Sequence, residues 1–297
     1  MKGKVTTALL ALALAAGLCL LLYPSVSDWW NSMHSSRAVA NYTEEVEALD
    51  EGKYDEMLSA ASEYNEGLLS RATDYALTEG QEAEYESLLD LDGSGVMGYI
   101  EIPSINVSLP IYHGTSDSVL QVGVGHLEWS SLPVGGDGTH CVLSGHRGLP
   151  SAKLFTNLDR LVEGDRFTIR VLGESLVYEV DQVLIVEPDD VSALAVVEGR
   201  DLCTLVTCTP YGINSHRLLV RGHRVEPEAG EATVTSDAVQ VEPLVVAPAV
   251  AAPILLALLA VLLATGGRKG DGGGKGGRKD GEGGEGRALE AGGMRDE

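Results

Sequence analysis

Two long apolar runs near the ends of the chain constrain its fold more than any other feature. Residues 5–23 carry no charge and follow two lysines, and residues 244–265 carry none and precede Arg268-Lys269. Each run is long enough to cross a hydrocarbon core of roughly 30 Å as a helix. Basic residues flank the outer end of each run, which favours a cytoplasmic location for both ends. We therefore expect two transmembrane helices, cytoplasmic termini and an extracellular segment between the spans.

The first apolar run could alternatively be a signal peptide that is cleaved off. Its apolar core is longer than the ~7–15 residues typical of a signal, and its best cleavage site, Ser25–Ser27, is poor. We assign residues 1–27 to an N-terminal anchor or signal, and the length favours the uncleaved anchor.

The net charge limits which molecules the chain can bind, and the cysteine count limits its disulfide pairing. The net charge is −23, and the segment after Thr265 is balanced, so the excess acid lies on the outer part of the chain. An acidic surface argues against nucleic acid as a partner. Outside the first span stand Cys141, Cys203 and Cys208, an odd number, so at least one of them has no partner within the chain.

Residues 28–95 have the apolar spacing of a helical arm, with apolar side chains recurring every three or four positions. Asp50-Glu51-Gly52 interrupts this pattern, which predicts two helices with Gly52 near the end of the first. Ala83–Leu89 is expected to add a short helix. At the other end, residues 226–243 are an acidic linker to the second span, and residues 266–297 are a Gly-rich cytoplasmic tail.

Residues 96–225 are typical of a β domain. Short runs rich in β-branched residues are separated by Gly, Pro or Asp, and seven or eight strands of this kind favour a barrel or a sandwich. Short helices are expected between strands at Ser151–Leu158 and Val191–Val197. The predicted strands are Val96–Ile102, Ile105–Tyr112, His140–Ser144, Arg166–Val171, Leu176–Val186, Leu202–Cys208 and Leu218–Arg224.

Three polar residues stand at the ends of these strands. His146 follows one strand, Cys208 ends another and Arg217 begins the next. A cysteine nucleophile needs a partner that stabilises its thiolate and protonates a leaving amine, and histidine does both. Arginine can stabilise the oxyanion that forms. The alternative is that Cys208 is a small buried hydrophobe within its strand.

The sequence around these residues resembles the sortase family. Thr204-Leu205-Val206-Thr207-Cys208 followed by Arg217 is similar to the family signature Thr-Leu-x-Thr-Cys with Arg on the next strand. The wider segments 96–103, 123–136, 144–155 and 204–222 are similar to class C sortases, which polymerise pilins. This resemblance implies a mainly β fold: an eight-stranded sortase-type barrel, with the helical arm and the two transmembrane helices flanking it.

The resemblance also implies a cysteine transpeptidase. Cys208 would cleave an LPxTG-like sorting signal between Thr and Gly through a thioacyl-enzyme, His146 would carry the proton and Arg217 would hold the oxyanion. The resolving amine would be a lysine of another pilin subunit, and the chemistry needs no cofactor or metal. The implied partners are secreted pilin-like proteins, with membrane lipid around the spans, at the outer face of a Gram-positive-type bacterial membrane.

Class C sortases carry a lid with an Asp-Pro-aromatic motif over the active site. The matching stretch here has Asp74 and Tyr75 without the intervening proline. We interpret it either as a looser lid or as a surface loop with no gating role. Ser144 and Thr207 complete the candidate substrate-binding residues.

The same residue types also allow other groupings. Cys203, Cys208, His216 and His223 have spacings that do not match compact zinc sites. Cys141 and Cys203 each stand five residues before a proposed catalytic residue, so each should face away from it. The resemblance implies that their two strands are neighbours in the barrel. We therefore expect the two cysteines to lie together beneath the active site, as two free thiols by default or as a disulfide.

Two alternative functions follow from the same sequence. A cell-wall-anchoring sortase would differ in the amine that resolves the thioester. A non-catalytic surface β-domain would leave Cys208, His146 and Arg217 without a joint role.

Overall fold

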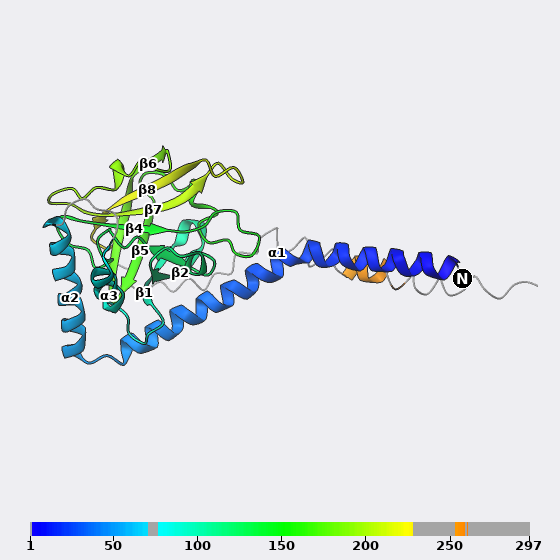
Figure 1. Ribbon diagram of the computed structural model, residues 1–297, viewed down its shortest axis with the longest axis horizontal. Helices are drawn as coiled ribbons and strands as arrows, with labels where there is room; N and C mark the ends of the chain where they lie inside the picture. Colours follow the sequence, from blue (N-terminus) through cyan, green and yellow to red (C-terminus); the bar gives the residue numbers. More distant parts are fainter. Residues whose placement is uncertain (1, 71–76, 228–252, 259, 261–297) are drawn as a thin grey trace, which may run out of the picture.

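The computed structural model describes residues 2–70, 77–227, 253–258 and 260 (Figure 1). Helix α1 (Lys2–Glu47) contains the first apolar run and continues without a break through Pro24. It is long and apolar enough to cross a bilayer, and none of its most apolar stretch is buried by the rest of the chain. In the second predicted span only 253–258 and 260 are described, and these residues are helical. The linker beyond Pro227 and the Gly-rich tail lie outside the described residues.

The helical arm continues with α2 (Glu51–Ser70) and α3 (Glu79–Ser87). The break lies close to the predicted one, but Gly52 stands in the first turn of α2 and does not end α1. The reason is a capping contact: Asp50 Oδ1 accepts a hydrogen bond from the Lys53 amide at 2.9 Å. The predicted helix at 83–89 begins earlier, because Thr78 forms a capping box with Gln81.

Eight strands form a closed barrel in the order β1-β2-β3-β4-β7-β8-β6-β5. The predicted eight-stranded barrel is therefore confirmed. The strands are β1 (Val96–Ile102), β2 (Val107–His113), β3 (Val124–His126), β4 (Thr139–Ser144), β5 (Arg166–Val171), β6 (Glu174–Val186), β7 (Asp201–Thr209) and β8 (His216–Val225).

Strand β3 was not among the seven predicted runs. It has three residues and contains Gly125, so it lacks the β-branched pattern of the others. A Cβ at Gly125 would lie 2.4 Å from the carbonyl oxygen of Gly114. Only glycine allows this close approach of the two segments.

The two helices predicted between strands were wrong in extent. In place of a helix at 151–158, the chain forms turns followed by a short 3₁₀-helix at Leu158–Arg160. Leu154 has a φ of 40°, a left-handed conformation that interrupts a right-handed helix. Within 191–197 only Ser192–Leu194 forms a 3₁₀ turn.

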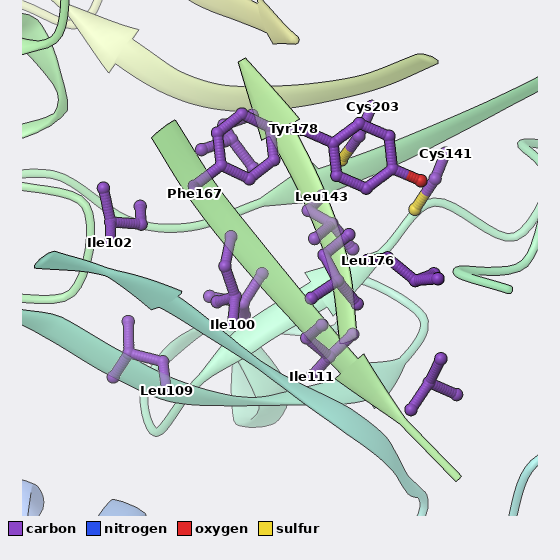
Figure 2. Close-up of a cluster of buried hydrophobic side chains, with 14 of the residues drawn as sticks. Ile100, Ile102, Leu109, Ile111, Cys141, Leu143, Phe167, Leu176, Tyr178 and Cys203 are labelled. Atoms are coloured by element: carbon purple, nitrogen blue, oxygen red, sulfur yellow. The ribbon is translucent and has the colours of Figure 1, made fainter. Parts of the chain in front are cut away.

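The barrel interior is packed with aliphatic and aromatic side chains (Figure 2). Phe167 and Tyr178 stack with ring centroids 5.5 Å apart. The Tyr178 hydroxyl donates to Asp201 Oδ1 at 2.9 Å, which satisfies the polar end of an otherwise apolar side chain. This filled interior makes the barrel wall a rigid support for residues on its outer face.

Candidate active site

Cys208 and Arg217 lie directly opposite each other on neighbouring antiparallel strands. Cys208 is near the end of β7, Arg217 is near the start of β8, and the two are Cα partners in the ladder. Directly opposed residues project to the same face, with Cβ atoms about 4.5–5.5 Å apart. Both side chains are partly exposed. The pairing therefore places a guanidinium beside an accessible thiol.

The parallel ladder between β4 and β7 brings His146 to the same place. Ser144 pairs with Val206, and the amide of Gly145 donates to the Val206 carbonyl at 3.0 Å. Two residues further along each chain are His146 and Cys208. The end of β4 therefore places the segment that carries His146 alongside the end of β7, on the side of β7 opposite to β8 and Arg217.

Cys208 and Arg217 share the outer face of the barrel with a small apolar cluster. Side chains alternate along a strand, so Val142 shares a face with Ser144, Val206 with Cys208, and Leu219 with Arg217. Those three apolar residues are buried together with Leu194. Of the candidate substrate-binding residues, Ser144 thus lies on the outer face of the barrel, the face that also carries Cys208.

Thr207 projects to the opposite face from Cys208. Its side chain is buried, and its Oγ1 donates to the carbonyl of Gly145 at 2.7 Å. Gly145 directly precedes His146. The hydroxyl therefore ties the end of β7 to the backbone that carries the histidine.

The loop after β4 closes on itself around His146. The Phe155 amide donates to the His146 carbonyl at 3.1 Å, and the Gly148 amide donates to Thr156 Oγ1 at 3.1 Å. The Phe155 ring packs so closely on Gly145 that a Cβ there would lie 2.6 Å from it. These local hydrogen bonds and the buried Phe155 ring hold the loop in an irregular conformation, and no helix forms here.

Arg147 connects this loop to the segment that follows Cys208, a role that sequence reasoning missed. It donates to Thr209 Oγ1 at 3.2 Å, pairs with Asp159 and lies 5.9 Å from the Tyr211 ring centroid. Its Nε is buried and, within the described part of the chain, has no hydrogen-bond partner. Its only signal in the sequence was its position beside His146.

Arg147→Ala should lower the free energy of unfolding by about 1–3 kcal/mol, because hydrogen bonds from a mostly buried charged group are lost. Arg160→Ala, an exposed position on the same loop, is the control and should change stability by less than about 0.5 kcal/mol. Urea denaturation in detergent measures both. Equal effects of the two variants would contradict the proposed bridging role of Arg147.

Comparison with known proteins identifies the family of this chain. A protein-family model of the sortase domain matches residues 100–225. Sortase C1 from Streptococcus agalactiae, a crystal structure, is 52% identical, with coverage of 65% of this chain and 100% of that chain and a TM-score of 0.63. This chain belongs to the sortase family.

Other proteins similar to this sortase are also sortases. Sortase C-1 from Actinomyces oris is 47% identical, with coverage of 59% of this chain and 99% of that chain and a TM-score of 0.56. Sortase D from Bacillus subtilis is 34% identical over 131 residues, or 43% of this chain and 63% of its own length. The curated relatives are matched over 58 to 64% of their lengths, which is less than two thirds. The resemblance to class C sortases is confirmed.

Cys141 and Cys203 lie side by side inside the sortase barrel, as predicted. They are Cα partners on β4 and β7, both are buried, and both are free thiols (Figure 2). Burial disfavours the thiolate of Cys141, but hydrogen bonds with Cys203 and His126 stabilise it and lower its pKa to about 6. Burial raises the pKa of Cys203 well above its usual range. Both thiols face the core and away from Cys208.

The native sortase should show one reactive thiol among Cys141, Cys203 and Cys208. Iodoacetamide at neutral pH should alkylate Cys208, because it is partly exposed, and should leave the buried pair unmodified. The intact mass before reduction should equal that after reduction, since neither buried thiol is oxidised. A gain of two protons on reduction would instead show a disulfide between β4 and β7.

The other histidines of the sequence analysis have partners away from Cys208. His126 contacts the Tyr85 hydroxyl at 3.0 Å, and His140 contacts Thr204 Oγ1 at 2.7 Å. His216 lies 3.3 Å from a carboxylate oxygen of Glu187. In the ranges that the structure describes, no group of three or more His, Cys, Asp or Glu side chains is placed to hold a metal ion.

Asp74 and Tyr75 lie outside the described residues. The first described residue after them, Leu77, is partly buried and packs against the main core.

Proposed function

We propose that this sortase is a cysteine transpeptidase that cleaves an LPxTG-like sorting signal between Thr and Gly and joins the Thr carbonyl to an amine. The pairing of Cys208 with Arg217, beside the strand β4 whose following loop carries His146, carries the proposal. It supplies a nucleophile, a proton carrier and an oxyanion donor on one rigid face.

In the first half-reaction the Cys208 thiolate attacks the Thr carbonyl carbon. The tetrahedral oxyanion accepts hydrogen bonds from the Arg217 guanidinium. These bonds lower the energy of the transition state most when water is excluded from the site. The C–N bond then breaks, and the imidazolium of His146 gives its proton to the departing Gly amine. The products are a thioester on Cys208 and the released C-terminal fragment.

In the second half-reaction an amine attacks the thioester carbon. Neutral His146 accepts the proton of the attacking amine, the C–S bond breaks and Cys208 returns to the thiolate. No redox change occurs, so the cycle needs no cofactor.

A lysine of a second pilin subunit is the proposed acceptor. The support is the similarity to sortase C proteins, among them the Streptococcus pneumoniae enzyme described in terms of pilin substrate specificity, at 41% identity. A Clostridium perfringens sortase C, at 42% identity, was solved with the C-terminal cell wall sorting motif. The proposed site of action is the outer face of the bacterial membrane, with α1 as an anchor and both termini cytoplasmic.

Acceptor competition tests this function. Full-length protein in detergent is incubated with an LPxTG peptide and an equimolar mixture of a lysine-containing pilin peptide and triglycine. We expect a product joined through the lysine ε-amine, identified by tandem mass spectrometry. Exclusive transfer to triglycine would support the cell-wall-anchoring alternative, and no cleavage of any LPxTG variant would support the non-catalytic one.

The Asp74–Tyr75 segment is proposed as a loose lid on the strength of the class C resemblance. Asp74→Ala should raise the initial rate of peptide cleavage, because a lid that competes with the signal for the active site is weakened. Glu79→Ala, in the neighbouring helix α3, is the control. An unchanged rate for Asp74→Ala would exclude a gating role.

A further inference from the structure

Helix α1 meets the barrel almost as soon as its apolar run ends. Asp28 follows Tyr23 by five residues, which corresponds to about 8 Å along a helix axis. Trp29 and Trp30 stand beside it and are 59% and 57% exposed. Tryptophans are enriched at membrane–water interfaces. This part of α1 therefore lies at the level of the lipid headgroups when the apolar run spans the bilayer.

At this level α1 holds the loop that carries His146. Asp28 Oδ1 accepts from the Lys153 amide at 2.9 Å, and Asp28 Oδ2 lies 3.6 Å from Lys153 Nζ. Asn31 Nδ2 donates to the Ser151 carbonyl at 2.8 Å. The same loop is bonded to His146 itself through the Phe155 amide. We call Asp28 and Asn31 the juxtamembrane clamp.

A cavity of about 670 Å³ lies beside this part of α1, and both polar side chains such as Ser32 and apolar ones such as Ile105 line it. On the barrel side of the loop, Leu154 and Phe155 are buried in the main core. On the other side, the hydrogen bonds from Asp28 and Asn31 join the loop to the helix. The clamp therefore couples a loop that the core anchors to the position of α1.

The barrel lies along α1 with its catalytic end toward the apolar run. Fourteen residues after Asp28, about 21 Å along the helix, the Tyr42 hydroxyl bonds to the Met97 carbonyl and the Leu172 amide. Leu172 lies in the turn between β5 and β6, and β6 runs from this turn to Val186, the ladder partner of Arg217, so the turn marks the end of the barrel opposite to Arg217. Figure 1 shows α1 passing along the barrel and leaving it toward the N-terminus.

We propose that the juxtamembrane clamp is a positioning element that fixes the His146 loop and makes the catalytic end of the barrel face the bilayer surface. The surface this end meets is the headgroup layer, and the helix imposes the contact, since the acidic outer domain gains no attraction from anionic lipid. The activity test below rests on the proposed function, whereas the orientation test does not.

Orientation is measured on full-length protein in nanodiscs with spin-labelled headgroup lipids. In a Cys19→Ala, Cys208→Ala background, one fluorophore is placed at Asn214→Cys in the β7–β8 turn, and another at Glu174→Cys at the opposite end. Both side chains are exposed, so a label at either position should leave the fold intact. We expect headgroup quenching at least twofold stronger at position 214. Equal quenching, or stronger quenching at 174, overturns the orientation.

Positioning is measured with the double variant Asp28→Ala/Asn31→Ala. We expect kcat to fall about 10-fold with KM nearly unchanged, because small displacements of a catalytic group are costly. Amide exchange of 146–157 should become faster. Asp28→Asn, which keeps an acceptor for the Lys153 amide, should recover part of kcat. Ser36→Ala, whose hydroxyl donates to the Ser32 carbonyl of its own helix, should match wild type.

Unchanged exchange of 146–157 in the double variant overturns the positioning role, whatever the activity. Faster exchange with an unchanged kcat does so as well, because the loop would then be held without consequence for His146. A wild-type protein that cleaves no LPxTG peptide counts against the proposed function, while quenching and exchange still decide the clamp.

Discussion

Replacing Cys208 with alanine should abolish cleavage of an LPxTG peptide, with a loss of at least about 10³-fold in kcat. The thioester cannot form without the sulfur, and the remaining oxyanion and binding contacts provide only residual catalysis. Discontinuous analysis of the peptide products by liquid chromatography measures the loss. This is the largest single effect that the site predicts.

Cys203→Ala is the matched control, because Cys203 lies on the same strand but faces the core. It should lose stability by about 1–2 kcal/mol through the cavity left behind, and it should keep kcat within a few-fold. If Cys203→Ala lost activity as completely as Cys208→Ala while still folded, the assignment of the nucleophile would be wrong.

Arg217→Ala should lower kcat by about 10²–10³-fold, the usual cost of removing an oxyanion donor. Arg217→Lys should recover only part of this, because lysine keeps the charge but not the planar fork of donors. KM should change less than kcat, since the hydrogen bond is strongest in the tetrahedral state. Steady-state kinetics on the same peptide separates the two constants.

His216→Ala tests whether the loss at Arg217 is specific. His216 is the preceding residue on β8 and contacts Glu187 and Ser215, so it projects away from Cys208. We expect its kcat to stay within about twofold of wild type, as for a surface substitution. If Arg217→Ala raised KM and left kcat unchanged, Arg217 would be assigned to substrate binding and not to stabilisation of the oxyanion.

Most of the barrel could be predicted because its strands carry their own signal. Runs such as Val96–Ile102 and Arg166–Val171 have the period-two, β-branched pattern of a half-buried strand, and their predicted bounds match the structure. β3 could not be predicted in this way. It exists because Gly125 allows two segments to approach closely, a tertiary condition that no local pattern expresses.

The candidate site was found because its residues end or begin regular strands. Once Cys208 ends one strand and Arg217 begins the next, an antiparallel pairing is enough to oppose them. Arg147 and the juxtamembrane clamp were missed for the converse reason. The contact of Arg147 with Thr209 and the contacts of the clamp join residues 62 to 125 positions apart in sequence, and irregular loops fix them.

The false helix at 151–158 has the same origin. Local propensity favoured a helix, but the loop gains more from the Phe155 bond to the His146 carbonyl and from the burial of the Phe155 ring. The sequence pattern was overridden by tertiary contacts at a place where the loop is needed to hold His146.

A thioester between Cys208 and the substrate would be visible in the intact mass of the protein during turnover. Full-length wild type and Cys208→Ala are mixed with an LPxTG peptide, quenched in acid and weighed. We expect a mass increase equal to the acyl fragment ending in Thr on wild type alone, mapped to Cys208 by peptide digestion. An adduct at another residue, or the same adduct on Cys208→Ala, would contradict it.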